Sequence, residues 1–126
     1  MSLNSILLVD DDVGVRQLVQ RTLEGVGHRV VSAGDGRAAS RAMAGDAFDL
    51  VITDLLMPDR DGLELIEELR RSYPWVRIIA MSGGGRVAAE EYLQIAKCLG
   101  ANGLLGKPFH PKQLLATVEQ VMAKSD

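Results

Sequence analysis

Short apolar runs alternate along the chain with longer stretches in which apolar residues recur at helical spacing. Five of these runs have the length of a β-strand, and they are Ile6–Val9, Arg29–Ser32, Leu50–Thr53, Arg77–Met81 and Asn102–Leu105. Helical periodicity follows each run, at about Val13–Glu24, Arg37–Ala44, Leu63–Arg71, Val87–Leu99 and Pro111–Ala123. Strict alternation of strand and helix predicts an α/β fold of the doubly wound class, with a parallel sheet covered by helices on both faces.

The predicted helices have defined ends and inward faces. Asp12 is placed to cap the first helix, Pro74 stops the third, and Pro111 suits the first turn of the fifth. The residues expected to face the core are Val15, Leu18, Val19 and Leu23 in the first helix, Ala38, Ala42 and Met43 in the second, Leu65, Ile66 and Leu69 in the third, and Leu114, Leu115, Val118 and Val121 in the fifth. Cys98 falls on an apolar face of the fourth helix, where we expect a small buried residue.

Length and composition narrow the class of protein. The chain has 126 residues, of which 47% are hydrophobic, and this predicts a single domain over residues 1–126. A net charge of −3 with scattered Lys and Arg gives no footprint for nucleic acid or an anionic membrane. No apolar run is long enough to cross a bilayer, and the first residues lack the layout of a signal peptide. With one cysteine and therefore no internal disulfide, we expect a protein of the reducing cytoplasm.

Polar residues that suit a chemical site follow four of the five predicted strands. In doubly wound folds the working residues gather at the carboxyl ends of the strands, near the point where the strand order reverses. In this chain those positions hold Asp10, Asp11, Asp54, Ser82, Gly83, Lys107 and Pro108. We therefore take these residues as one set at one edge of the sheet.

The acidic members of the set predict a site for a hard divalent cation. Asp10, Asp11 and Asp54 offer only oxygen ligands, which suits Mg²⁺, a cation that keeps several waters and typically bridges to a phosphate oxygen. The alternative interpretation of the triplet at 10–12 is a solvated turn with a helix cap, which is favoured for an isolated acidic triplet. The presence of Asp54 and Lys107 at the same edge reverses that preference.

The remaining members suit an anion. A lysine, a hydroxyl and exposed backbone N–H groups, here Lys107, Ser82 and Gly83–Gly85, make a cradle for a tetrahedral anion. Lys107 beside Asp54 also fits an ordinary ion pair. Together with the cation site, these residues have the parts needed for phosphoryl transfer to a carboxylate, with Asp54 as the nucleophile and an aspartyl phosphate as the product.

Four stretches make the chain resemble the receiver domain of two-component response regulators, the CheY-like family. They are ILLVDDD, DLVITDLLMPDRDG, RIIAMSG and GANGLLGKPF, which occur in order and with similar spacing over essentially the whole chain. The resemblance implies a flavodoxin-like sheet of strand order 2-1-3-4-5 flanked by five helices. It also implies a signalling phosphoacceptor, which is not an enzyme beyond catalysing its own phosphorylation and a slow autodephosphorylation.

The resemblance implies roles for the acidic residues. Asp54 would accept the phosphoryl group from a sensor histidine kinase, a histidine phosphotransfer protein or a small phosphodonor. Asp11, Asp54 and the backbone carbonyl of Leu56 would bind Mg²⁺ directly, with Mn²⁺ as a substitute, and Asp10 would act through a water molecule.

The phosphoryl-binding and switch positions match the family less uniformly. Ser82 stands where the family has Thr or Ser, Lys107 stands at the family's lysine, and both would hold the phosphoryl group together with Gly83. The Lys107–Pro108 peptide bond is expected to be cis. Leu104 stands at the switch position where the family has Tyr or Phe, so switching would run through the Ser82 loop, aliphatic repacking or a partner.

Two further departures concern the segment after the fourth strand and the phosphate lifetime. The stretch SGGGRVAAEEY is longer than in common receivers, and its glycines predict a mobile loop. Its Tyr92 is a candidate substitute for the missing aromatic, although a packing role is favoured. Leu56 and Gly84 offer no polar side chain to orient a hydrolytic water, so we hypothesise slow loss of phosphate unless a partner assists.

The resemblance also implies an output surface. The face built by the fourth helix, fifth strand and fifth helix would bind a downstream effector. Its expected exposed positions are Glu90, Glu91, Gln94 and Lys97.

Other classes of protein fit less well. A receiver-shaped binding module that is never phosphorylated would not need the intact acidic set. A haloacid-dehalogenase-type phosphatase also begins with Asp10-x-Asp12, but it needs a further acidic pair, and only Glu119 and Asp126 follow the lysine. A flavodoxin-type FMN site would need a hydroxyl- and glycine-rich phosphate loop. His28 and His110 are interpreted as lone packing or surface histidines.

Overall fold

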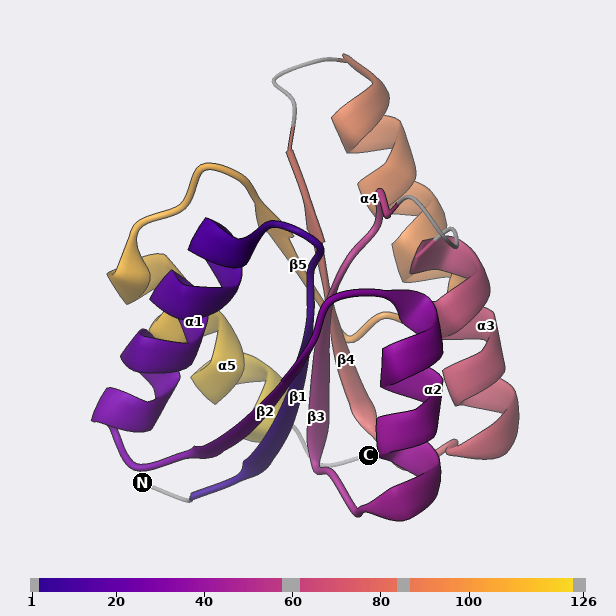
Figure 1. Ribbon diagram of the computed structural model, residues 1–126. Helices are drawn as coiled ribbons and strands as arrows, with labels where there is room; N and C mark the ends of the chain where they lie inside the picture. Colours follow the sequence, from indigo (N-terminus) through magenta and orange to yellow (C-terminus); the bar gives the residue numbers. More distant parts are fainter. Residues whose placement is uncertain (1–2, 58–61, 84–86, 124–126) are drawn as a thin grey trace.

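A computed structural model describes residues 3–57, 62–83 and 87–123, with the backbone alone for residues 87–90 and 92 (Figure 1). Strands and helices alternate through this part of the chain. The strands are β1 (Ser5–Val9), β2 (Arg29–Ala33), β3 (Leu50–Asp54), β4 (Arg77–Ser82) and β5 (Gly103–Gly106). The helices are α1 (Val13–Gly25), α2 (Gly36–Gly45), α3 (Gly62–Ser72), α4 (Val87–Leu99) and α5 (Pro111–Ala123).

The strands form one parallel sheet in the order β2-β1-β3-β4-β5. The predicted fold class and strand order are confirmed. Val9 at the end of β1 pairs with Ala33 on one side and with Thr53 on the other, so three strands end at the same level. Because the chain leaves β1 in one direction and returns to β3 on the opposite side, the strand order reverses between these two strands, where doubly wound folds place their sites.

Helices cover both faces of the sheet, α1 and α5 on one face and α2, α3 and α4 on the other (Figure 1). Successive residues of β1 therefore enter different cores. Ile6 and Leu8 pack in the core under α1 and α5, whereas Leu7 and Val9 pack in the core under the other three helices. A strand buried on both faces must be apolar without interruption, which explains the continuous run that precedes the aspartates.

Most of the predicted inward faces are confirmed. The fully buried helix residues include Val19 and Leu23 in α1, Met43 in α2, Leu65, Ile66 and Leu69 in α3, and Leu114, Val118 and Val121 in α5. Val15, Ala38, Ala42 and Leu115 are only partly buried against these cores. In α2 the fully buried alanine is Ala39, which shares one helix face with Met43, so the face against the sheet is rotated by about 100° from that of Ala38 and Ala42.

Two predictions of burial are wrong. Leu18 of α1 is 47% exposed, because it lies beside the core stripe of Val19 and Leu23 and faces a cavity at the end of the sheet. Cys98 of α4 is exposed, whereas Ala96 in the same turn is buried. Cys98 lies two residues after Ala96, and this spacing places the two side chains about 200° apart around the helix. Within the described residues, no helix has the length and apolar character needed to span a membrane.

Candidate functional site

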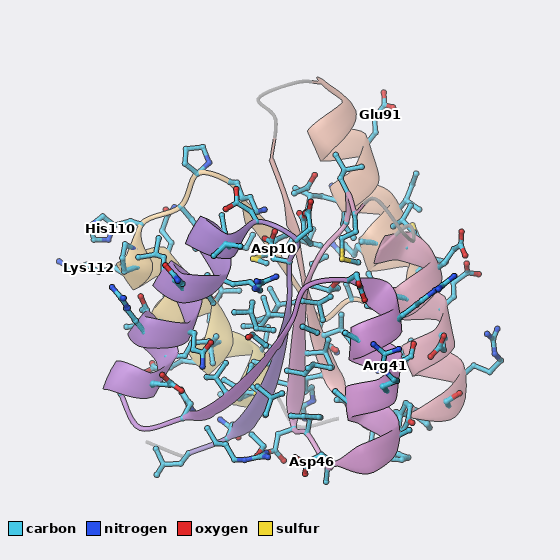
Figure 2. All side chains as sticks on the ribbon, in the orientation of Figure 1. Asp10, Arg41, Asp46, Glu91, His110 and Lys112 are labelled. Carbon is cyan, nitrogen blue, oxygen red and sulfur yellow. The ribbon has the colours of Figure 1, made fainter. Side chains whose placement is uncertain are left out.

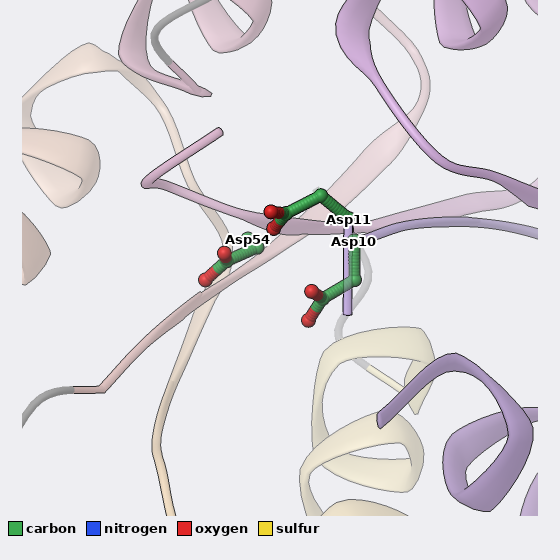
Figure 3. Close-up of side chains that lie close together, drawn as sticks. All are labelled: Asp10, Asp11 and Asp54. Atoms are coloured by element: carbon green, nitrogen blue, oxygen red, sulfur yellow. The ribbon is translucent and has the colours of Figure 1, made fainter. Parts of the chain in front are cut away.

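Three carboxylates meet where β1 and β3 end. Asp10 directly follows β1, Asp11 comes next, and Asp54 is the last residue of β3 rather than the first residue after it. One oxygen of each carboxylate lies within 4.8 Å of the others, and Figure 3 shows the three groups clustered together. Asp10 and Asp54 are buried, whereas Asp11 is exposed, so the cluster opens to solvent on the side of Asp11.

In the turn between β1 and α1, the three consecutive aspartates differ in their contacts. The N–H of Asp12 donates to Oδ1 of Asp10 at 2.9 Å, and the carboxylate of Asp12 accepts from the N–H of Val15 at 3.1 Å. Asp12 is therefore the N-cap of α1, as predicted. The guanidinium of Arg16 donates to the carbonyl oxygen of Asp10 at 3.0 Å and fixes the turn from the side of the helix.

Lys107 joins the two buried carboxylates. Its Nζ lies 2.8 Å from Oδ2 of Asp10 and 3.3 Å from Oδ1 of Asp54. Its backbone N–H donates to the carbonyl oxygen of Ser82 at 2.7 Å, and the peptide bond between Lys107 and Pro108 is cis. Lys107 is the first residue after β5, and this position places its side chain at the acidic cluster, next to the end of β4.

Burial and charge act in opposite directions on the pKa values at the site. Burial raises the pKa of Asp54 to about 6, an effect that the positive charge of Lys107 partly opposes and the negative charge of Asp10 reinforces. Burial alone would lower the pKa of Lys107, but its hydrogen bond to Asp10 and the charges of Asp54 and Asp10 raise it. Lys107 therefore stays protonated, and burial destabilises the charged form of Asp54.

Ser82 and Gly83 flank the acidic cluster at the end of β4. The side chain of Ser82 is 1% exposed, and its Oγ has no hydrogen-bond partner among the described residues. Buried hydroxyls are almost always satisfied, so this atom points to a ligand that completes the site. A Cβ on Gly83 would lie 2.7 Å from Cβ of Lys107, so glycine at this position allows the lysine stem to pass closely.

A cavity of about 430 Å³ opens beside these groups. Among the described residues, its polar lining consists of Asp54, Gly83 and Lys107. The other described lining residues are apolar and are Val15, Leu18, Leu56, Pro108 and Phe109. We call this space the site cavity.

The donor set fits a hard divalent cation. Asp10, Asp11 and Asp54 supply carboxylate oxygens alone, the ligand type that Mg²⁺ prefers, and the opening beside Asp11 leaves room for the waters that Mg²⁺ retains. Such a cation would offset the repulsion between the carboxylates, which Lys107 already offsets in part.

The structure brings most of the predicted set together and leaves some positions apart. Leu56 is 50% exposed and lines the site cavity, whereas Leu104 packs partly buried in the core under α2, α3 and α4. Gly84, the side chain of Tyr92 and much of the predicted mobile loop lie outside the described residues.

The two histidines have local structural roles, as interpreted from the sequence. Nδ1 of His28 accepts from the N–H of Asn4 at 3.1 Å, and Nδ1 of His110 accepts from the N–H of Lys112 at the start of α5.

Sequence reasoning missed three residues that shape the site. Gly62 begins α3 directly against the end of β3, Arg16 holds the carbonyl of Asp10, and Phe109 lines the cavity. Arg16 lies about one helical turn into α1, and this position is a signal from which its reach back to the strand end was foreseeable. Neither glycine packing nor the cavity leaves such a signal in a single sequence.

The comparisons with known proteins all point to the same family. Residues 6–119 match the family described as the response regulator receiver domain. The chain is 36% identical over 97% of its length to the DNA-binding transcriptional regulator NtrC of Azospirillum brasilense, of which it spans 25%. It is 34% identical to the chemotaxis response regulator CheY4 of Vibrio cholerae, with a TM-score of 0.86 over 95% of this chain and 99% of that one.

A third relative is the receiver domain of NtrX from Brucella abortus, which is 32% identical with a TM-score of 0.88 over 95% of this chain and 99% of that one. The TM-scores of the two solved structures show that they share the fold of this chain, and the family match covers every residue of the acidic and lysine cluster. The chain belongs to the response regulator receiver domain family of two-component signalling systems.

Proposed function

We propose that residues 1–126 form one receiver domain that accepts a phosphoryl group on Asp54 in a Mg²⁺-dependent reaction. The observation that supports this most directly is the meeting of three carboxylates, the ammonium group of Lys107 and the unpartnered hydroxyl of Ser82 at one strand edge. An ordinary ion pair would explain the lysine and one carboxylate. It would explain neither the exposed third carboxylate nor a buried hydroxyl without a partner.

In the proposed reaction a carboxylate oxygen of Asp54 attacks the phosphorus of the donor. A new bond forms between phosphorus and this oxygen, the bond from phosphorus to the donor breaks, and its electron pair leaves with the donor group. Lys107 stabilises negative charge on the phosphoryl oxygens, and the hydroxyl of Ser82 donates to one of them. Attack requires ionised Asp54, and the nearby ammonium group of Lys107 favours this form, which partly opposes the effect of burial on its pKa.

A cation held by Asp10, Asp11, Asp54 and the backbone carbonyl of Leu56 would neutralise charge on the phosphoryl oxygens and orient them. Mg²⁺ is the proposed cation and Mn²⁺ its substitute, since both accept carboxylate oxygens. The buried Asp10 is already hydrogen-bonded to Asp12 and Lys107, which agrees with contact through a water molecule.

The proposed partners are a sensor histidine kinase or a histidine phosphotransfer protein as donor, in the cytoplasm, and an effector that reads the phosphorylated state. The surface proposed for the effector is formed by α4, β5 and α5. Glu91, Gln94 and Lys97 are exposed there, and Figure 2 shows Glu91 projecting outward from α4. The side chain of Glu90 lies outside the described residues.

The test is the intact mass of the protein after incubation with acetyl phosphate, with and without Mg²⁺, beside the variant Asp54→Ala. We expect a phosphoryl adduct that needs Mg²⁺ and is absent from the variant. Release of phosphate in excess of protein without an adduct would favour the phosphatase alternative. The absence of both adduct and release would favour a binding module that is never phosphorylated.

A further inference from the structure

The site cavity is larger and more apolar than a phosphoryl group alone requires. Among the described residues, its lining combines Asp54, Gly83 and Lys107 with five apolar side chains from α1, the segment after β3 and the segment after β5. Ligand pockets for small organic molecules have this composition and a volume of about 300–1,000 Å³. The cavity of about 430 Å³ therefore has room for the part of a phosphodonor that does not react.

We infer that the site cavity selects small acyl phosphates whose acyl group carries an apolar chain. This inference rests on the proposed function, because it assigns the leaving group of the same reaction. The phosphoryl end of such a donor is anionic and complements Lys107 and the N–H of Gly83, whereas its acyl chain is apolar and complements Leu18 and Phe109. One cavity thus offers polar groups to the phosphoryl end of the donor and apolar side chains to its acyl chain.

The chemical step is the same for every donor in the series. Asp54 attacks phosphorus, the bond between phosphorus and the acyl oxygen breaks, and a carboxylate leaves with the electron pair. Acetate and butyrate are carboxylates of similar basicity, so lengthening the chain changes contacts in the cavity rather than the leaving ability of the group. A difference in rate between the two donors therefore reports on the cavity.

Burial of apolar surface sets the size of the expected effect. Each methylene group fully removed from water raises the rate constant by about fourfold, if the chain is buried when phosphorus is attacked. Butyryl phosphate has two methylene groups more than acetyl phosphate, so complete burial corresponds to about 15-fold and partial burial to about threefold or more. The measured quantity is the ratio of the second-order rate constants for the two donors, followed by intact mass at fixed Mg²⁺.

Two exposed side chains provide a matched pair of variants. Leu18 on α1 and Ile95 on α4 are both 47% exposed, and only Leu18 lines the site cavity. We expect Leu18→Asn to bring the butyryl-to-acetyl ratio at least about twofold closer to one, because the chain loses an apolar contact. Ile95→Asn has the same change in chemistry on a different helix and is expected to leave the ratio unchanged. Val15→Thr, nearly isosteric, supplies a second cavity variant with the same expected direction.

The outcomes separate this inference from the proposed function. If acetyl phosphate produces no adduct on Asp54, the proposed function itself fails. If acetyl phosphate produces the adduct but the ratio is close to one in the unmodified protein, only the inference fails. A raised ratio that Leu18→Asn and Ile95→Asn lower equally would also overturn it, since the preference would then arise outside the cavity.

Discussion

Gly62, the first residue of α3, packs directly against the main chain of Leu55 at the end of β3. The N–H of Gly62 donates to the carbonyl oxygen of Leu55 at 2.9 Å, and a Cβ at position 62 would lie 2.6 Å from the Leu55 Cα. It would also overlap the carbonyl oxygen of Asp54. Atoms do not approach this closely without bonding, so a side chain at position 62 has to displace the segment that carries the proposed phosphoacceptor.

The first prediction concerns this contact. We expect Gly62→Ala to lower the free energy of unfolding by about 1–3 kcal/mol, because the added methyl group meets backbone that has no room to move. The rate of phosphorylation of Asp54 should fall as well, since its position depends on the same backbone. Urea denaturation and the mass assay measure the two effects.

The matched control is Gly45→Ala at the end of α2, where a Cβ would have open space around it. This change should leave the stability unaltered or raise it by about 0.4–1 kcal/mol, since alanine restricts the unfolded chain. Equal behaviour of the two variants would contradict the packing argument for Gly62.

The second prediction follows from the raised pKa of Asp54. Its pKa is about 6 in the folded protein and 3.8 in its unperturbed state, so the folded protein binds this proton more tightly. This carboxyl therefore contributes least stability above pH 6, and its contribution is regained as the pH falls through 6 toward 3.8. In metal-free protein we expect Asp54→Asn to be more stable than the unmodified chain at neutral pH, by up to about 3 kcal/mol.

The check is the difference in free energy of unfolding between these two proteins across the pH range from 3.5 to 8, roughly the window in which unperturbed and raised carboxyl groups titrate. The difference should shrink as the pH falls, and the effects of titrating groups that do not interact with Asp54 cancel in it. Adding Mg²⁺ at neutral pH should stabilise the unmodified chain more than the variant. A difference that stays constant with pH would mean that burial does not perturb Asp54.

The third prediction compares the roles of two buried hydroxyl groups. Oγ of Ser82 has no partner among the described residues, whereas Oγ1 of Thr53 donates to the carbonyl oxygen of Asp54 at 2.9 Å. We expect Ser82→Ala to leave the stability of the unphosphorylated protein unchanged or higher, and to slow phosphorylation at least about tenfold because a donor to the phosphoryl oxygen is lost.

Thr53→Val is the comparison, because it removes a buried hydroxyl that already has a partner. It should cost about 1–2 kcal/mol of stability, measured by the same denaturation experiment. A loss of stability in Ser82→Ala of similar size would show that Ser82 serves the folded state rather than a ligand.

The fourth prediction tests the hypothesis of a long-lived phosphate. Leu56 is 50% exposed, lines the site cavity and has no polar atom in its side chain. We expect Leu56→Asn to speed loss of phosphate from Asp54 by at least about fivefold, because an amide placed there orients an attacking water. Decay of the adduct after removal of the donor, followed by intact mass, gives the rate.

Leu56→Ala distinguishes orientation of water from simple access of water, since it opens the site without adding a hydrogen-bonding group. Its decay should remain within about twofold of the unmodified protein, well below the gain expected for a positioned polar group. If alanine and asparagine accelerate the decay equally, access of water to Asp54 limits the reaction. The hypothesis that the missing polar side chain slows the decay is then wrong.

The alternation of strand and helix was predictable because each strand is buried on both faces. Such a strand has to be apolar throughout, and the aspartates after Val9 then mark its end without ambiguity. The meeting of Asp10, Asp54 and Lys107 followed from the same logic, since the carboxyl ends of parallel strands lie on one edge. The periodicity of the sequence does not predict the order of the strands in the sheet, and this order was predicted from the resemblance to a family.

Other features depend on how elements tilt and pack, which periodicity does not encode. Leu18 and Val19 are adjacent in an apolar stretch, yet one lines an open cavity and the other is fully buried. Cys98 lies on a helix whose outer side also carries apolar residues such as Ile95, so its exposure had no signature. The need for glycine at position 62 is visible only once α3 lies against β3.

The strand order has a mechanical consequence. β3 lies in the middle of the sheet with a hydrogen-bonded neighbour on each side, whereas β5 is a four-residue strand at the rim of the described sheet. Asp54 therefore ends a strand that is held on both sides, whereas Lys107 follows an edge strand held on one side and is tied inward through Ser82. A strand with two hydrogen-bonded neighbours is harder to displace than a strand with one, so the proposed phosphoacceptor would keep its place while the edge of the sheet shifts.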